Sequence, residues 1–188
     1  ESLKKLKTDY VDLLLVHWPF PETPVARLVE GVMEAQAAGK ARLIGVSNFT
    51  VAQMEEALKF SGGKVCNNQV EYHPYLSQKP VLDFIRRNGM ALTAYSPIAR
   101  GKAVKDTTLK KIGLKYGKSA GQVCLRWLVQ QDGVIAIPKS ATPENIKSNI
   151  DIFDFELGAD DMRKIEALAS PDGRQVNPDF APAWDRAP

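Results

Sequence analysis

The sequence has few of the residues that define disulfide-rich, metal-binding or membrane proteins. Its 188 residues include two cysteines, Cys66 and Cys124, and two histidines, His17 and His73. Two cysteines are too few for a disulfide framework or a cysteine zinc cluster, and we expect no metal site. Apolar runs such as residues 13–16 are far shorter than the roughly 20 residues that a membrane-spanning helix needs. The sequence therefore argues against a disulfide-rich protein, a metal-binding protein and a membrane-spanning protein.

The sequence also lacks a strong charge of one sign. Lys and Arg number 25 and Asp and Glu 22, so the net charge is +3, and no basic run is present. We therefore expect neither nucleic acid nor a membrane as a partner. No signal-peptide pattern and no paired cysteines are evident, which predicts a reducing, cytoplasmic location. The composition, 44% hydrophobic and 25% charged, is typical of one globular domain over residues 1–188.

Short apolar segments alternate with segments of helical spacing. The strand-like segments are residues 10–17, 41–47, 65–71, 90–95 and 134–137. The helix-like segments are residues 24–38, 50–60, 77–88, 107–116, 119–131, 142–149 and 160–169, and residues 1–6 look like the end of another helix. Five such repeats predict a parallel sheet in which each strand is buried on both faces. We expect residues 171–188, rich in Pro and Asp, to form an irregular tail on the surface.

Both an open doubly wound sheet and part of a closed (β/α) barrel fit this alternation. No strand runs into a G-x-G-x-x-G turn, so the usual dinucleotide-binding fingerprint of the open sheet is absent. A closed eight-stranded barrel typically has about 250 residues. Five strands in 188 residues therefore fall short of closure.

Polar or aromatic side chains follow every predicted strand, where parallel α/β folds bind their ligands. Lys139 and Ser140 follow the last strand and precede a helix start at Thr142. A cation near a helix start suits a phosphate, although a solvated loop lysine is the commoner case. The other strand ends carry His17-Trp18-Pro19, Ser47-Asn48-Phe49, Glu71-Tyr72-His73-Pro74 and Tyr95-Ser96-Pro97-Ile98.

Asn67, Gln69 and Glu71 share one face of the third strand at period two. A buried polar group without a partner costs about 1–3 kcal/mol, so each needs a hydrogen bond. A polar ligand and an internal hydrogen-bond network are both open for them. His17 either faces a ligand or bonds a neighbouring loop, and Trp18 either packs in the core or lines a pocket.

Five segments in this order and spacing resemble the fourth to eighth strands of the aldo-keto reductases. They are residues 9–19 (DYVDLLLVHWP), 45–49 (GVSNF), 68–74 (NQVEYHP), 95–97 (YSP) and 137–140 (IPKS) with the downstream Asn149. The resemblance covers essentially the whole chain. The ending PDFAPAWD, residues 178–185, is most similar to bacterial 2,5-diketo-D-gluconate reductases.

The resemblance implies a (β/α)8 barrel that reduces aldehydes and ketones, including keto-sugars, with NADPH, and that is a monomer when full length. His17 matches the histidine that hydrogen-bonds the carbonyl oxygen, and Trp18 and Trp184 match the walls of the substrate pocket. The cofactor positions are Ser47, Asn48 and Gln69 for the carboxamide, Tyr95 for the nicotinamide ring, Ser96, Ile98 and Gly101 for the pyrophosphate loop, and Lys139, Ser140, Thr142, Asn145 and Asn149 for the adenosine end.

Two departures from the family pattern matter. The family usually has an arginine at the position of Asn145, and many members have a glutamate at Ser148. Asn145 cannot stack on adenine and pair with a phosphate as arginine does. Lys139 keeps one cation, so we expect NADPH with NADH as the less favoured cofactor. The family's catalytic Tyr, Asp and Lys lie on segments before the fourth strand, and we expect the chain to lack them together with about three strands.

Three interpretations follow. The first is an NADPH-dependent reductase, of which this chain is a portion inactive by itself. The second is a barrel that binds a nicotinamide nucleotide without turnover, in a regulatory role. The third is an inactive fragment, since an incomplete barrel would expose two sheet edges and an apolar interior. The family's Asp, Tyr and Lys in the native gene would favour the first.

Overall fold

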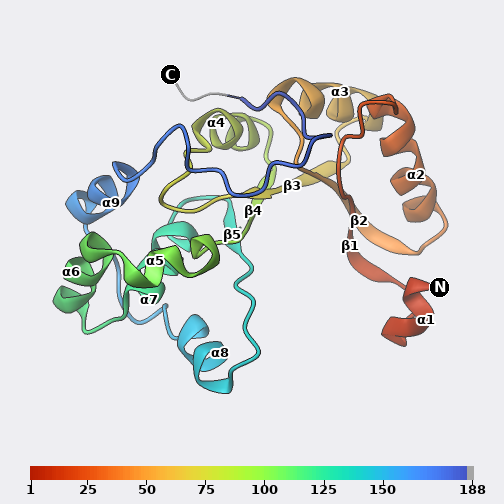
Figure 1. The fold of residues 1–188 in the computed structure, drawn as a ribbon. Helices are drawn as coiled ribbons and strands as arrows, with labels where there is room; N and C mark the ends of the chain where they lie inside the picture. Colours follow the sequence, from red (N-terminus) through yellow and green to blue (C-terminus); the bar gives the residue numbers. More distant parts are fainter. Residues whose placement is uncertain (186–188) are drawn as a thin grey trace. The chain divides into compact units, whose positions relative to one another are not determined.

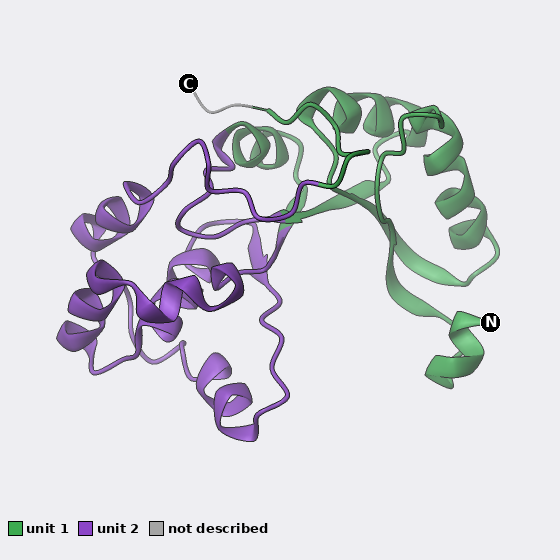
Figure 2. Ribbon diagram, viewed as in Figure 1, with its two compact units in different colours: residues 1–70, 80–92, 178–188 green, residues 71–79, 93–177 purple. Residues whose placement is uncertain are grey.

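The computed structural model describes residues 1–185, and helices and strands alternate along them (Figure 1). These residues form two compact units, shown in Figure 2. Unit 1 comprises residues 1–70, 80–92 and the described residues from 178 onward. Unit 2 comprises residues 71–79 and 93–177.

In the described residues, five strands form one sheet in the order β1-β2-β3-β4-β5. The pairs β1–β2 and β2–β3 are parallel, with Leu14 opposite Ile44 and Ser47 opposite Gln69. All five strands were predicted from the sequence to within one residue at each end, which confirms the parallel α/β sheet. Their bounds are β1 (Val11–Val16), β2 (Ala41–Ser47), β3 (Val65–Glu71), β4 (Ala91–Tyr95) and β5 (Val134–Ala136).

The helices predicted from apolar spacing are also present, and their bounds differ from the prediction by at most three residues. A short 3-10 turn and the helix after it were not predicted, because the segment after β4 has no apolar periodicity. The helices are α1 (Ser2–Leu6), α2 (Val25–Ala37), α3 (Val51–Ser61), α4 (Lys79–Arg87), η1 (Ala99–Gly101), α5 (Lys102–Lys105), α6 (Thr107–Tyr116), α7 (Ala120–Val129), α8 (Pro143–Ile150) and α9 (Ala159–Glu166).

The start of α3 is fixed by a capping box. Thr50 Oγ1 accepts a hydrogen bond from the Gln53 amide, and Gln53 Oε1 accepts one from the Thr50 amide at 3.0 Å. These bonds satisfy backbone donors that a helix start leaves without partners, and such caps stabilise a helix by about 0.5–2 kcal/mol. The cap lies two residues beyond Asn48, so it also limits the conformations of the loop that leaves β2.

Each unit has its own apolar core. Val29, Ile44, Met54 and Ile85 are completely buried in unit 1. In unit 2, Leu109, Leu125, Leu128 and Ile165 are completely buried, and they bring α6, α7 and α9 together. Burial of this kind contributes about 25 cal/mol for each Å² of apolar surface removed from water.

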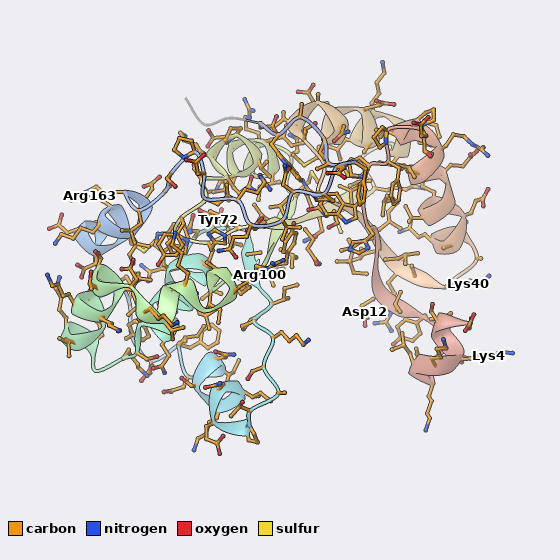
Figure 3. The ribbon with its side chains drawn as sticks, viewed as in Figure 1. Lys4, Asp12, Lys40, Tyr72, Arg100 and Arg163 are labelled. Carbon is orange, nitrogen blue, oxygen red and sulfur yellow. The ribbon has the colours of Figure 1, made fainter. Side chains whose placement is uncertain are left out.

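The expectation that each strand is buried on both faces is wrong for β1, β2 and β5. Leu43 on β2 and Ile135 on β5 are about half exposed, at 51% and 50%. The helix α2 packs against β1 and β2 from one side, whereas Asp12 on β1, labelled in Figure 3, reaches solvent and pairs with Arg42 at 2.9 Å. An apolar strand sequence is therefore buried only where another element packs over it.

The tail is irregular, as predicted, since residues 171–185 contain no helix or strand. Its description as a purely surface segment is wrong at Gly173, which is buried. A Cβ atom at Gly173 would lie 1.6 Å from the Tyr75 carbonyl oxygen. The chain can approach Tyr75 this closely only because glycine has no side chain. Residues 186–188 of the predicted tail lie outside the described residues.

Candidate functional site

In unit 1 the strand ends bring together the first group of predicted site residues. The backbone oxygen of His17, after β1, accepts a hydrogen bond from Asn48 Nδ2 at 3.0 Å. Ser47 Oγ donates to the Gln69 carbonyl oxygen at 2.8 Å, and the Asn48 amide donates to the same oxygen at 2.9 Å. Ser47 and Asn48 are buried, whereas the His17 side chain is exposed. The backbone thus fixes these groups while the imidazole remains accessible.

Asn48 has a left-handed backbone with φ of 64°. Asparagine adopts this conformation more readily than most residues because its short polar side chain can bond locally. Its Nδ2 atom does so here, to His17 and to Ser47 Oγ at 3.1 Å. Strained backbone of this kind occurs often at functional sites, and it marks the loop that the sequence motif singled out.

Asn68 is a residue of this region that the sequence analysis did not assign. Its side chain is completely buried. Its Nδ2 atom donates to the Phe49 carbonyl oxygen at 2.9 Å, and its Oδ1 atom accepts from the Phe49 amide at 3.4 Å. Both backbone groups of the residue after Asn48 are therefore held by one side chain. The signal was present in the sequence, as a second asparagine on the other face of a buried strand.

Aromatic rings of the tail pack around Trp18 in unit 1. Trp18 is 9% exposed, and Phe180 and Trp184 meet its ring edge-on at centroid distances of 5.4 and 6.1 Å. Asp185 Oδ2 accepts a hydrogen bond from the Val51 amide at 2.9 Å, at the first turn of α3. Trp18 thus packs and also contacts Trp184, the other predicted pocket residue. Phe180 was not predicted, because a lone phenylalanine between prolines carries no pattern.

In unit 2, Tyr95 ends β4, and the Tyr72 amide donates to its carbonyl oxygen at 3.3 Å. Burial, followed by the negative charge of Glu71, raises the pKa of the Tyr95 hydroxyl to about 12. The phenol is therefore neutral at physiological pH, and its ring is suited to stack on another flat ring.

The loop after Tyr95 is tightly turned. Ser96, Ala99 and Arg100 have φ between 49° and 51°. The Gly101 amide donates to the Ile98 carbonyl oxygen at 3.0 Å. The structure therefore places Ser96, Ile98 and Gly101 in one compact turn.

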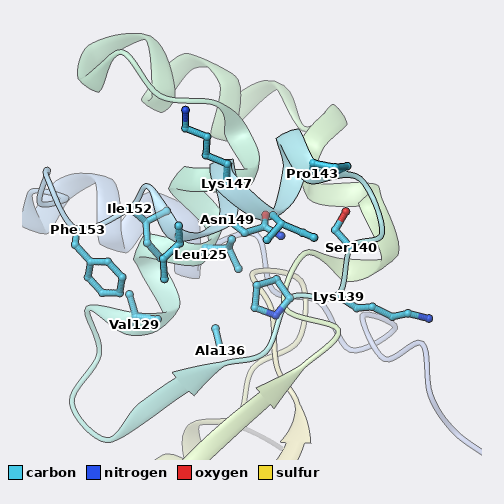
Figure 4. Close-up of a pocket in the computed structure, with 13 residues that line it drawn as sticks. Leu125, Val129, Ala136, Lys139, Ser140, Pro143, Lys147, Asn149, Ile152 and Phe153 are labelled. Carbon is cyan, nitrogen blue, oxygen red and sulfur yellow. The ribbon is translucent and has the colours of Figure 1, made fainter.

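Unit 2 also contains a cavity of about 890 Å³ between β5, α7 and α8 (Figure 4). Lys139, Ser140 and Asn149, three of the predicted adenosine-end residues, line it together with apolar side chains. Thr142 is joined to Ser140 by a hydrogen bond from its amide to Ser140 Oγ at 3.1 Å. Asn145 does not line the cavity. In Figure 4 the Lys139 side chain extends away from the apolar lining, so its ammonium group is free to meet a soluble anion.

Glu71 belongs to an internal hydrogen-bond network. Glu71 and His73 are both completely buried, and Glu71 Oε1 lies 2.9 Å from His73 Nε2. The Gln175 and Val176 amides donate to the same carboxylate at 2.9 Å each. The sequence left two partners open for Glu71, a polar ligand and an internal hydrogen-bond network. The structure shows the internal network. His73 has a structural position as its partner.

Residues 1–185 contain neither a cluster of metal ligands nor a membrane-spanning helix. No three His, Cys, Asp or Glu side chains in this part of the chain gather as metal ligands would. None of the helices described here has the length and apolar character needed to cross a bilayer.

The parallel sheet, with polar groups at the ends of its strands, is that of an α/β protein. Residues 1–170 match the model of the aldo/keto reductase family, so the chain belongs to this family. The sequence resemblance is thereby confirmed, as is the predicted fold class, part of a (β/α)8 barrel of this type.

Three similar proteins support this assignment. The chain is 42% identical to methylglyoxal reductase DkgB of Salmonella typhi over 189 residues, covering 98% of this chain and 70% of the relative. It is 51% identical to the crystal structure of a candidate 2,5-diketo-D-gluconic acid reductase B, with a TM-score of 0.96, covering 98% of this chain and 66% of that one. An aldo-keto reductase of Bombyx mori in complex with NADP is 35% identical, with a TM-score of 0.85, covering 95% and 63%. The chain thus spans about two thirds of the length of these proteins.

Proposed function

We propose that the protein containing this chain reduces small carbonyl compounds with NADPH. The observation that carries the proposal is the cluster at the ends of β1, β2 and β3, where Asn48 joins the exposed His17 to Ser47 and Gln69. Reductase names among the relatives support it, and so does a relative that binds NADP. Methylglyoxal and a keto-sugar such as 2,5-diketo-D-gluconate are the substrates that the names of similar proteins suggest.

The residues present fit a nicotinamide cofactor. The side-chain amide of Gln69 is half-buried and has no hydrogen-bond partner among residues 1–185, and an amide can pair with a carboxamide through both a donor and an acceptor. Tyr95 offers a neutral ring, and Lys139 with Ser140 offers a cation and a hydroxyl to a phosphate. NADPH, when bound, supplies the hydride to the carbonyl carbon.

His17 would act on the substrate oxygen. Its imidazole is exposed beside a fixed backbone, so it can donate a hydrogen bond to a carbonyl oxygen as negative charge develops there. Trp18, Phe180 and Trp184 would exclude water from one side of the substrate.

Carbonyl-dependent oxidation of NADPH tests the proposed function directly. We expect the natural protein, with any flanking sequence retained, to oxidise NADPH when methylglyoxal is added. The 188-residue chain alone should not reduce carbonyl compounds at a useful rate, since none of its tyrosines matches the family's proton donor. The absorbance of NADPH measures the activity of both proteins. If the natural protein bound NADPH but did not oxidise it, the regulatory alternative would be favoured.

The choice between NADPH and NADH should depend on Lys139. We expect Lys139→Ala to raise the dissociation constant for NADPH about tenfold, the effect of one charge-assisted hydrogen bond, and to leave that for NADH within about twofold. Fluorescence titration of both nucleotides measures this. Lys147→Ala is the matched control, since Lys147 lines the same cavity but is not a predicted phosphate ligand. Equal losses for both nucleotides would contradict the role of Lys139.

A further inference from the structure

The carboxylate of Glu71 holds the start of the C-terminal segment, residues 170–177. Glu71 is completely buried in unit 2 at the end of β3. Its Oε1 atom accepts from the Gln175 amide, and its Oε2 atom accepts from the Val176 amide, each at 2.9 Å. His73 Nε2 lies 2.9 Å from Oε1. One side chain thus satisfies two successive backbone donors that are a hundred residues away in the sequence.

The same segment is fixed at two further points within unit 2. The Ser170 amide donates to the Tyr75 carbonyl oxygen at 3.1 Å. Gly173 lies against that oxygen so closely that no side chain would fit. The Gln175 side chain also donates to the Ala99 carbonyl oxygen at 3.3 Å, which connects the segment with the turn after Tyr95.

The Glu71 carboxylate is charged at neutral pH. Burial by itself would raise the pKa of Glu71, but the hydrogen bonds from His73, Val176 and Gln175 outweigh it, and the pKa lies below its ordinary value. Hydrogen bonds to an ionised acceptor are about twice as strong as neutral ones. Only an anionic acceptor with two oxygens can serve all three donors at once.

We propose that Glu71 is a positioning residue, whose buried carboxylate fixes the start of the C-terminal segment and thereby the aromatic residues that follow it. Phe180 and Trp184 come four and eight residues after Val176 and pack on Trp18 in unit 1. This inference rests on the proposed function, in which those rings form one side of the substrate pocket. Glu71 does not contact the substrate or the cofactor in this scheme.

The experiment compares Glu71→Gln and Glu71→Asp in the natural protein. Glutamine has one acceptor oxygen, and its NH₂ group opposes a donor, so we expect hydrogen exchange at the Gln175 and Val176 amides to become about 10- to 100-fold faster. KM for methylglyoxal should rise about tenfold, while the dissociation constant for NADPH stays within about twofold, because neither Glu71 nor the aromatic rings of the tail are among the predicted cofactor residues. Aspartate keeps the charge on a shorter side chain and should restore part of both properties.

Glu156→Gln is the matched control, since Glu156 is exposed and we expect no change in exchange or KM. Unchanged exchange at the two amides in Glu71→Gln would overturn the proposal. Faster exchange with an unchanged KM would overturn it as well, because the segment would then not set the substrate pocket. A parent protein without carbonyl reduction would contradict the proposed function instead, and the exchange rates would still decide whether Glu71 holds the segment.

Discussion

His17→Ala should lower kcat/KM for methylglyoxal by about 100- to 1,000-fold, the usual effect of removing one donor to a developing oxyanion. The imidazole is exposed, and the contact of His17 with Asn48 runs through its backbone oxygen, which alanine retains. The free energy of unfolding should therefore change by less than about 0.5 kcal/mol. Steady-state kinetics and urea unfolding of the natural protein measure the two quantities.

His17→Gln provides the comparison that separates chemistry from shape. Glutamine keeps an amide donor near the position of an imidazole nitrogen, so this variant should lose less activity than the alanine variant. The dissociation constant for NADPH should be the same in both. If the alanine variant retained kcat/KM within about fivefold of the parent, His17 would not be the donor to the carbonyl oxygen.

The fold could be predicted from the sequence because its signals are local. Apolar runs of strand length and helical spacing gave the bounds of β2 and β3 and of α6 without error. Burial could not be predicted in the same way, since Leu43 and Ile135 are as apolar as their buried neighbours. Whether a strand is covered depends on elements distant in the sequence.

Candidate site residues could be proposed from the sequence, but the hydrogen bonds that hold them in place could not. His17, Ser47 and Asn48 follow or end strands and Gln69 lies inside β3, and all four belong to recognisable motifs. Asn68 lies in a quoted motif, but the motif does not show that its side chain holds the backbone of Phe49. The partners of Glu71 in the tail carry no pattern. Their roles depend on hydrogen bonds to backbone groups, and any residue type can offer those groups. The positive φ of Asn48 and Ser96 could not be predicted from the sequence either.

Asn68→Ala should lower the free energy of unfolding by about 2–6 kcal/mol, because it leaves both buried backbone groups of Phe49 without a partner, at about 1–3 kcal/mol each. Asn68 is completely buried, so water cannot replace the amide. Phe49 follows Asn48 directly, and a loosened Phe49 should also weaken nicotinamide binding. Urea unfolding and a fluorescence titration with NADPH measure the two effects.

Two variants separate the hydrogen bonds from the cavity that alanine leaves. Asn68→Leu keeps the number and branching of the side-chain heavy atoms and leaves no cavity, yet it should still lose more than about 2 kcal/mol, since the Phe49 groups remain unsatisfied. Asn88→Ala removes a similar bond, from Nδ2 to the Phe84 carbonyl oxygen at 2.8 Å. Asn88 is exposed, so water takes over the freed carbonyl and the loss should stay within about 1 kcal/mol. A leucine variant as stable as the parent would show that packing, and not the two bonds to Phe49, makes Asn68 necessary at the base of the site.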